Sequence, residues 1–184
     1  MFSKPIGMIV AGILGFLLLI FGISVIIGYN GLVNKDEAID NQISQISIRI
    51  DNKDNVLEEM LDAISNLQDY SLEVYTLVTN ARIAYANASN SGNIDDLADA
   101  DALLTDAYDR FLVVIEDNNL ESAVPGYMLL LEQIHTTNGL IAQARRDYNT
   151  AVTDYRTAVR RFPGVIYARW FGFDREVTYW EDTE

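Results

Sequence analysis

The chain opens on an apolar run that predicts a membrane-spanning helix. From Ile6 to Gly28 no side chain carries a charge. A helix of this length reaches about 34 Å at 1.5 Å per residue, enough to cross a hydrocarbon core of about 30 Å with some tilt. A cleavable signal peptide would have a shorter apolar stretch and an A-x-A-like site, which does not follow here. We therefore expect a single transmembrane helix over residues 6–28, after a short tail of residues 1–5.

Beyond this run, apolar residues recur every three or four positions, which predicts α-helices. No alternating pattern typical of a strand interrupts them. Two stretches are expected to face a core: Ile39, Ile43, Ile46, Ile50, Leu57, Met60, Ile64, Leu67, Val74, Leu77 and Val78 in the first, and Leu97, Leu104, Ala107, Tyr108, Phe111 and Ile115 in the second.

The last long helix has heptad character, because its large apolar residues recur at intervals of seven. Asn138 and Arg145 fall at the margin of the resulting inward stripe, and Pro163 with Gly164 ends the pattern. The residues that recur are Tyr127, Ile134, Ile141, Tyr148, Tyr155 and Phe162.

Three polar segments punctuate the helical pattern. "NASNSGN" (87–93) predicts a loop with Asn93 or Asp95 capping the next helix, and "EDNNLESAVPG" (116–126) predicts another break. "DNKDN" (51–55) suits a hairpin or helix break, but the apolar stripes on both sides stay in phase, so one continuous helix fits as well. We expect an all-α chain in which an antiparallel, four-helix-type bundle of long helices occupies residues 29–184, with an aromatic tail from residue 163.

Composition narrows the function classes. The formal charge of −14 predicts repulsion from nucleic acids and from anionic lipid surfaces. The absence of cysteine and the single histidine exclude disulfides, thiolate nucleophiles and Cys/His zinc sites. Lys4 before the apolar run and Lys35 behind it give a slight preference for a cytoplasmic amino terminus.

Three small residues lie four positions apart within the apolar run: Gly7, Ala11 and Gly15. They share one helix face, where a second backbone could approach closely, and this favours self-association in the membrane. The alternative is that glycine is simply common in membrane helices.

Two related segments place polar residues beside an apolar stripe. The pattern A-R-x-x-Y contains Arg82 and Tyr85 in its first copy, and Arg145 and Tyr148, followed by Asn149, in its second. The structural interpretation is that each arginine stem covers the core while its guanidinium pairs with carboxylates or caps carbonyls of a neighbouring helix. The alternative is a polar recognition patch for a partner.

The best candidate for enzymatic chemistry is Glu132-x-x-His135, a spacing found in di-iron carboxylate bundles. On the heptad both residues fall outside the inward stripe, and such a site would need a second histidine. A Ser-His-Asp arrangement would have to use the same His135. We therefore predict no catalytic, metal-binding or cofactor-binding residues.

Four segments together resemble the LemA family: "YNGLVNKDEAIDNQISQI" (29–46), "VTNAR" (78–82), "IAQARRDYNTAV" (141–152) and "RRFPGVIYARWFGF" (160–173). The resemblance implies a short amino terminus exposed outside the cytoplasm, one membrane helix and an antiparallel helical bundle, with no enzymatic activity established for the class. Tyr29 and Asn30 begin the first segment and join the residues of the two arginine motifs as candidate structural or partner-contact residues.

The chain departs from the LemA pattern at three places. Ile43 stands where the family usually has tryptophan, and no proline lies near Glu58. The family's Thr-Glu-Asn before the second Ala-Arg is Thr-Asn-Gly at 137–139, which removes an acidic partner for an internal arginine.

We expect a single-pass cell-membrane protein, on an undecided side of the membrane, whose helical bundle acts as a scaffold and forms a homo-oligomer. The alternative is a membrane-tethered module that recruits an unidentified protein. An enzyme such as a carboxylate-metal bundle ranks third. The lipid bilayer is the expected non-protein partner, and no nucleic acid or cofactor is expected.

Overall fold

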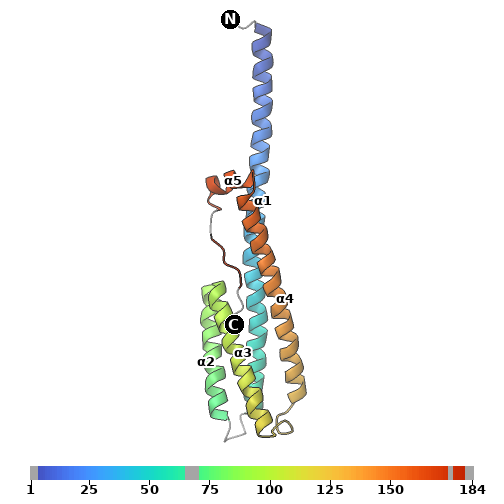
Figure 1. Ribbon diagram of the computed structural model, residues 1–184, viewed down its shortest axis with the longest axis vertical. Coiled ribbons are helices and arrows are strands. Elements are labelled where there is room, and N and C mark those ends of the chain that lie inside the picture. The colour runs from blue at the N-terminus through green and yellow to red at the C-terminus, as the bar shows by residue number, and fades with distance from the viewer. Residues whose placement is uncertain (1–3, 65–70, 174–175, 181–184) are drawn as a thin grey trace. The chain divides into compact units, whose positions relative to one another are not determined.

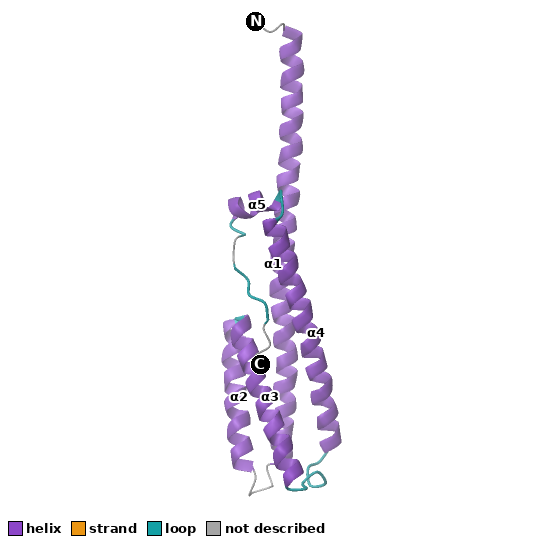
Figure 2. Cartoon of the chain, in the orientation of Figure 1, coloured by secondary structure: helices purple, strands orange, loops and turns teal. Residues whose placement is uncertain are grey.

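The computed structural model of the chain describes residues 4–64, 71–173 and 176–180, and its regular elements in this part are all helices (Figure 2). The predicted all-α class is therefore confirmed. The helices are α1 (Lys4–Ile64), α2 (Ser71–Ser91), α3 (Ile94–Asp117), α4 (Tyr127–Arg160) and α5 (Gly164–Phe171).

The chain divides into two compact units. Unit 1 comprises residues 1–39 and 151–177, and unit 2 comprises residues 40–150 and 178–184. Helices α1 and α4 contribute to both units. Within unit 2, the second half of α1, α2, α3 and most of α4 form an antiparallel four-helix arrangement, as the short connections between successive helices require (Figure 1).

The predicted stripes form the core of unit 2. Ile46, Leu57 and Met60 of α1 are fully buried, and the fully buried Phe111 of α3 belongs to the same core. The heptad residues Tyr127, Ile134, Ile141 and Tyr148 of α4 are also buried, together with Ile50, Val74, Val78, Leu97, Leu104 and Ile115.

Helix α1 runs through the "DNKDN" segment without a break, so the continuous-helix alternative is the correct one. The segment contains no proline or glycine, and two of its polar residues face the protein interior: Lys53 and Asp54 are buried. The apolar stripe therefore keeps its phase from Ile39 to Ile64. The stripe expected to continue to Val78 is divided between α1 and α2, and Leu67 lies outside the described residues.

The predicted loop at 87–93 is much shorter than expected, because α2 continues to Ser91. Two of its polar side chains donate to carbonyls of the preceding turn, Asn90 to Ala86 at 2.8 Å and Ser91 to Ala88 at 2.9 Å. Gly92, at a φ of 64°, makes the turn. Asn93 caps α3 as predicted: its side-chain oxygen accepts a hydrogen bond from the Asp95 backbone N–H at 2.9 Å.

Unit 1 has a small apolar core of its own. Tyr167 and Ala168 of α5 pack on Leu32 of α1, with Val25, Ala158, Val159 and Phe173 around them. The expectation that Phe162 continues the buried heptad stripe is wrong. Because α4 ends at Arg160, the periodicity stops two residues earlier and the Phe162 side chain is 77% exposed.

The first part of α1 presents its apolar side chains to the surroundings. In the described part of the chain, α1 is the helix that is long and apolar enough to cross a membrane. Leu18 and Phe16 are 69% and 63% exposed, although burial is the usual fate of such side chains in water. This agrees with the expected N-terminal membrane helix.

Candidate functional site in the bundle interior

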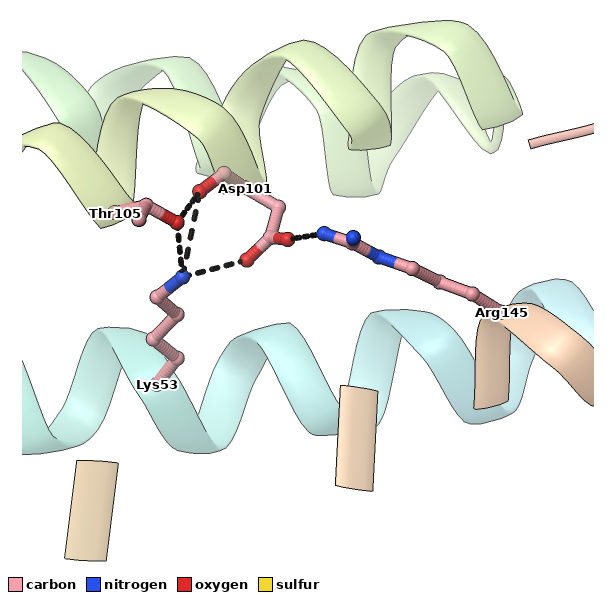
Figure 3. Close-up of polar contacts among 4 residues, drawn as sticks. All are labelled: Lys53, Asp101, Thr105 and Arg145. Carbon is pink, nitrogen blue, oxygen red and sulfur yellow. Dashed lines mark hydrogen bonds and ion pairs between the residues drawn. The ribbon is translucent and has the colours of Figure 1, made fainter. Parts of the chain in front are cut away.

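An ionic cluster is buried among α1, α3 and α4 of unit 2 (Figure 3). The Lys53 ammonium donates to Asp101 Oδ1 at 2.9 Å and to Thr105 Oγ1 at 2.5 Å. The other carboxylate oxygen of Asp101 accepts from the Arg145 guanidinium. The Lys53 and Asp101 side chains are each 1% exposed, whereas that of Arg145 is 27% exposed. One carboxylate therefore joins three helices.

Burial sets the electrostatics of this cluster. Removal from water lowers the pKa of Lys53, the charge and hydrogen bond of Asp101 act in the opposite direction, and the nearby Arg145 lowers it further. Because an unpaired charge is strongly destabilising when it is buried, each charged group of the cluster depends on its oppositely charged partner. The cluster fixes the register of the helices, and both carboxylate oxygens of Asp101 are engaged within it.

Arg82 makes a second ionic link, between α2 and α1. Its guanidinium donates to Asp54 Oδ1 at 3.0 Å and to Glu58 Oε2 at 2.9 Å. Burial raises the pKa of Asp54, and the hydrogen bond and charge of Arg82 act against that rise. Both motif arginines thus pair with carboxylates of a neighbouring helix.

The tyrosines of the two A-R-x-x-Y segments also make equivalent contacts. The Tyr85 hydroxyl donates to the Ser47 carbonyl at 3.0 Å, and the Tyr148 hydroxyl donates to the Thr178 carbonyl at 2.8 Å. In each segment the arginine binds a side chain and the tyrosine, three residues on, binds a backbone carbonyl. The repeat is one structural device used twice.

Asn149 holds the C-terminal segment of unit 2. Its side-chain oxygen accepts from the Trp180 backbone N–H at 2.8 Å, and its side-chain nitrogen donates to the Trp180 carbonyl at 3.2 Å. The Trp180 ring lies 4.7 Å from the Arg145 guanidinium carbon and is 6% exposed. Trp180 thereby covers part of the Arg145 guanidinium in a cation–π contact.

The remaining sequence-predicted residues lie in unit 1. The Tyr29 ring packs edge-on against Phe171, with ring centroids 5.0 Å apart, whereas Asn30 is exposed. Gly7, Ala11 and Gly15 are exposed along α1, and a Cβ at either glycine would meet no atom within 4 Å. Association through this face stays a prediction.

The buried pair of Lys53 and Asp101 was not predicted from the sequence, although a signal was present. Lys53 lies three residues after Ile50 and four before Leu57, and so occupies a core position of its stripe. Asp101 lies four residues after Leu97 and three before Leu104, and so occupies a core position as well. Opposite charges that fill gaps in two stripes predict a buried pair; the polar run around Lys53 suggested a turn instead.

A groove runs along unit 2 between α1 and α2, with a volume of about 700 Å³. We call it the acidic groove, because Asp51, Asp54, Glu58 and Asp62 of α1 line one side of it. The α2 side carries Arg82 together with Tyr75, Thr79, Ile83, Tyr85, Ala86, Ser89 and Asn90. The lining thus contains four carboxylates and one arginine.

The Glu132-x-x-His135 motif lies on the solvent side of α4, where both residues are exposed, as the heptad indicated. Among the described residues, no group of three or more histidine and acidic side chains is arranged to hold a metal ion.

The sequence model of the LemA family matches residues 42–184 of the chain. The chain belongs to the LemA family. The match covers the whole of unit 2 except its first two residues, and it includes both arginine motifs and α5. LemA proteins are not known as an enzyme family. No curated protein matches the chain.

Proposed function

We propose that this LemA-family protein is a membrane-anchored helical scaffold whose copies assemble at the membrane. The observation that carries the proposal is the composition of α1. One continuous helix, Lys4–Ile64, bears an exposed apolar run at its start and the central core stripe of unit 2 at its end. A helix with this pattern serves as a membrane anchor and as part of a soluble bundle.

The interior of unit 2 suits a scaffold. Its charged groups are engaged with one another across three helices, and such buried networks specify one arrangement of the helices more than they add stability. Ligand recognition therefore falls to the outer surfaces of the bundle and to the membrane helix.

Self-association is supported by the small-residue face of the membrane helix. Lipid supplies no hydrophobic drive between helices, so their association depends on close backbone approach. Gly7 and Gly15 leave open space at the surface of α1. The negative charge of the chain opposes crowding, but charges more than about 10 Å apart are largely screened at moderate salt.

Cross-linking in native membranes tests the proposal. We expect a ladder of adducts at multiples of the subunit mass. Ala11→Leu and Gly15→Leu should shorten this ladder, whereas Ile13→Phe, which adds comparable bulk at an exposed position on the opposite helix face, should leave it unchanged. If all three variants assemble like the parent, the small-residue face is not the interface. Absence of the ladder from the parent itself would overturn self-assembly.

The acidic groove favours a second candidate function, the recruitment of another protein. Its excess of carboxylates beside the exposed Tyr75 and Ile83 complements a basic segment that also carries apolar side chains. Under this alternative, cross-linking gives one dominant mixed adduct, and Asp51→Asn with Asp62→Asn weakens it.

A further inference from the structure

The charges of the chain are segregated between its two units. Unit 1 has seven basic and five acidic residues, a balance of +2. Unit 2 has the remaining six basic and 22 acidic residues, a balance of −16. The net charge of −14 predicted repulsion from anionic lipid for the chain as a whole, but this expectation does not apply to unit 1, which also contains the apolar run.

Helix α5 packs against α1 where the apolar run ends (Figure 1). The Tyr167 hydroxyl lies 3.1 Å from Ser24 Oγ, and the Tyr167 ring packs so closely on Gly28 that a Cβ at this position would collide with it. Tyr29, the next residue, packs on the rings of Phe171 and Phe173. If the run crosses a bilayer, α5 lies at the level where hydrocarbon gives way to lipid headgroups.

The outer face of α5 is mostly apolar. Tyr167 and Ala168 face the core of unit 1, and the opposite face presents Val165, Ile166 and Trp170, which are 45%, 36% and 60% exposed. Arg169 is the fourth residue of this face. The neighbouring Phe162 adds a further exposed ring. Tryptophan and arginine beside aliphatic residues are typical of helices that lie in the membrane interface.

A pocket of about 420 Å³ lies between the end of α4 and α5. We call it the arginine pocket, since its lining includes Arg156, Arg160 and Arg169, with Glu176 as the acidic group. Its other lining residues are mainly apolar: Tyr155, Val159, Val165, Ala168, Phe173 and Val177. Guanidinium groups beside apolar side chains suit a phosphate that is attached to acyl chains.

We propose that α5 lies in the headgroup layer of the bilayer crossed by α1, with Trp170 and Ile166 at the acyl boundary and the arginine pocket holding the phosphate of an anionic lipid. This inference rests on the proposed membrane anchorage of α1. Helix α5 then forms a second point of attachment to the bilayer, more than a hundred residues after α1's apolar run in the sequence. It also explains why a short helix exposes large apolar side chains without forming a larger core.

Tryptophan quenching in vesicles that contain brominated phospholipids tests the position of α5. Trp170→Phe isolates the signal of Trp170 by difference, and the buried Trp180 of unit 2 serves as the internal control. Bromines near the headgroups should quench Trp170 more than bromines near the chain ends. Leu17→Trp, placed in the Trp170→Phe background, reports on the anchor itself and should show the reverse order.

Anionic lipid retained by the detergent-extracted protein tests the arginine pocket. Arg160→Gln and Arg169→Gln should each reduce the anionic-over-zwitterionic preference by about fivefold, as expected for an arginine at a charged membrane surface. Arg146→Gln, which removes an exposed arginine from unit 2, should not change the preference.

The outcomes separate the two proposals. A quenched Leu17→Trp with an unquenched Trp170 would overturn the position of α5 and leave the anchor intact. An unquenched Leu17→Trp would overturn the anchor and, with it, the interfacial helix. Cross-linking of position 170 to a second protein in place of lipid contact would also overturn the inference. Equal lipid preference in the parent and both arginine variants would remove the phosphate site.

Discussion

Replacing Asp101 with asparagine removes the negative charge that lies between Lys53 and Arg145 while preserving the shape of the side chain. The new amide can still accept from the Lys53 ammonium through its oxygen, but its NH₂ group cannot accept from Arg145. Lys53 would then keep its charge with its side chain only 1% exposed. Arg145 is less affected, because its side chain is 27% exposed and can bind water.

Breaking a buried ion pair by removing one partner costs about 3 to 5 kcal/mol, and we expect Asp101→Asn to fall in this range. For a chain of this size the loss corresponds to a fall in Tm of about 6 to 20 °C. Lys53→Met should cost less, because Asp101 then keeps Arg145. The double variant Lys53→Met/Asp101→Asn should be more stable than Asp101→Asn by about 1 kcal/mol or more, since no ammonium is left buried.

The loss of stability caused by Asp101→Asn should be smaller at alkaline pH. The folded pKa of Lys53 is already below 10.5, and removal of Asp101 takes away the largest influence that raises it. Between the lowered folded pKa and 10.5 the unfolded chain binds more protons, so stability rises with pH. In Asp101→Asn this window is wider than in the parent protein.

Urea unfolding of the full-length protein in a mild detergent, followed by circular dichroism at the helical minimum, measures these differences. The four proteins, parent, two single variants and the double, form one thermodynamic cycle. The reasoning is refuted if Asp101→Asn lies within about 1 kcal/mol of the parent, or if the double variant is no more stable than that single variant.

Three further predictions concern other contacts inside unit 1 or inside unit 2. Arg145→Ala should lower the free energy of unfolding by about 1 to 3 kcal/mol; an unchanged Tm with lost partner binding would favour the recognition-patch alternative. Arg82→Gln should raise the pKa of Asp54 further in an NMR titration, because Arg82 counteracts the effect of burial. Between pH 3.8 and that raised pKa the folded state binds more protons, so stability should fall with rising pH over a wider range than in the parent; an unchanged pKa would contradict the pairing. Gly28→Ala should displace the Tyr167 ring and make α5 more sensitive to protease. Gly31→Ala, where the added methyl group meets open space, should leave the protease sensitivity of α5 unchanged. Equal digestion of the two variants would contradict the packing of Tyr167 on Gly28.

The helical fold could be predicted from the sequence because the apolar spacing is regular over most of the chain. Prediction failed where runs of polar residues were taken as signs of a loop. The "NASNSGN" run is mostly helix, and Asn90 and Ser91 donate to backbone carbonyls of α2. Phe162 continued the spacing of seven beyond the physical end of α4 at Arg160. The spacing of apolar residues alone does not show where the backbone stops being helical.

Half of the candidate site could be predicted from the sequence. The position of Arg145 beside an apolar stripe indicated a covered stem and a paired head, and the loss of the family's glutamate before the second Ala-Arg left its partner open. The structure supplies that partner from another helix, as Asp101 of α3. Periodicity shows which face a residue occupies, but which helices are neighbours depends on how the bundle packs. The contact between Asn149 and Trp180 could not be predicted from the sequence for the same reason.

The central claim, that the protein assembles through copies of itself at the membrane, is tested most directly by the mass and composition of the complex extracted from native membranes in a mild detergent. Light scattering combined with mass spectrometry of the subunits gives both quantities. The account predicts a particle that contains this chain alone at a defined multiple of the subunit mass, and smaller particles for Gly15→Leu. A monomer, or a complex with one copy of this chain and a different protein, would contradict it.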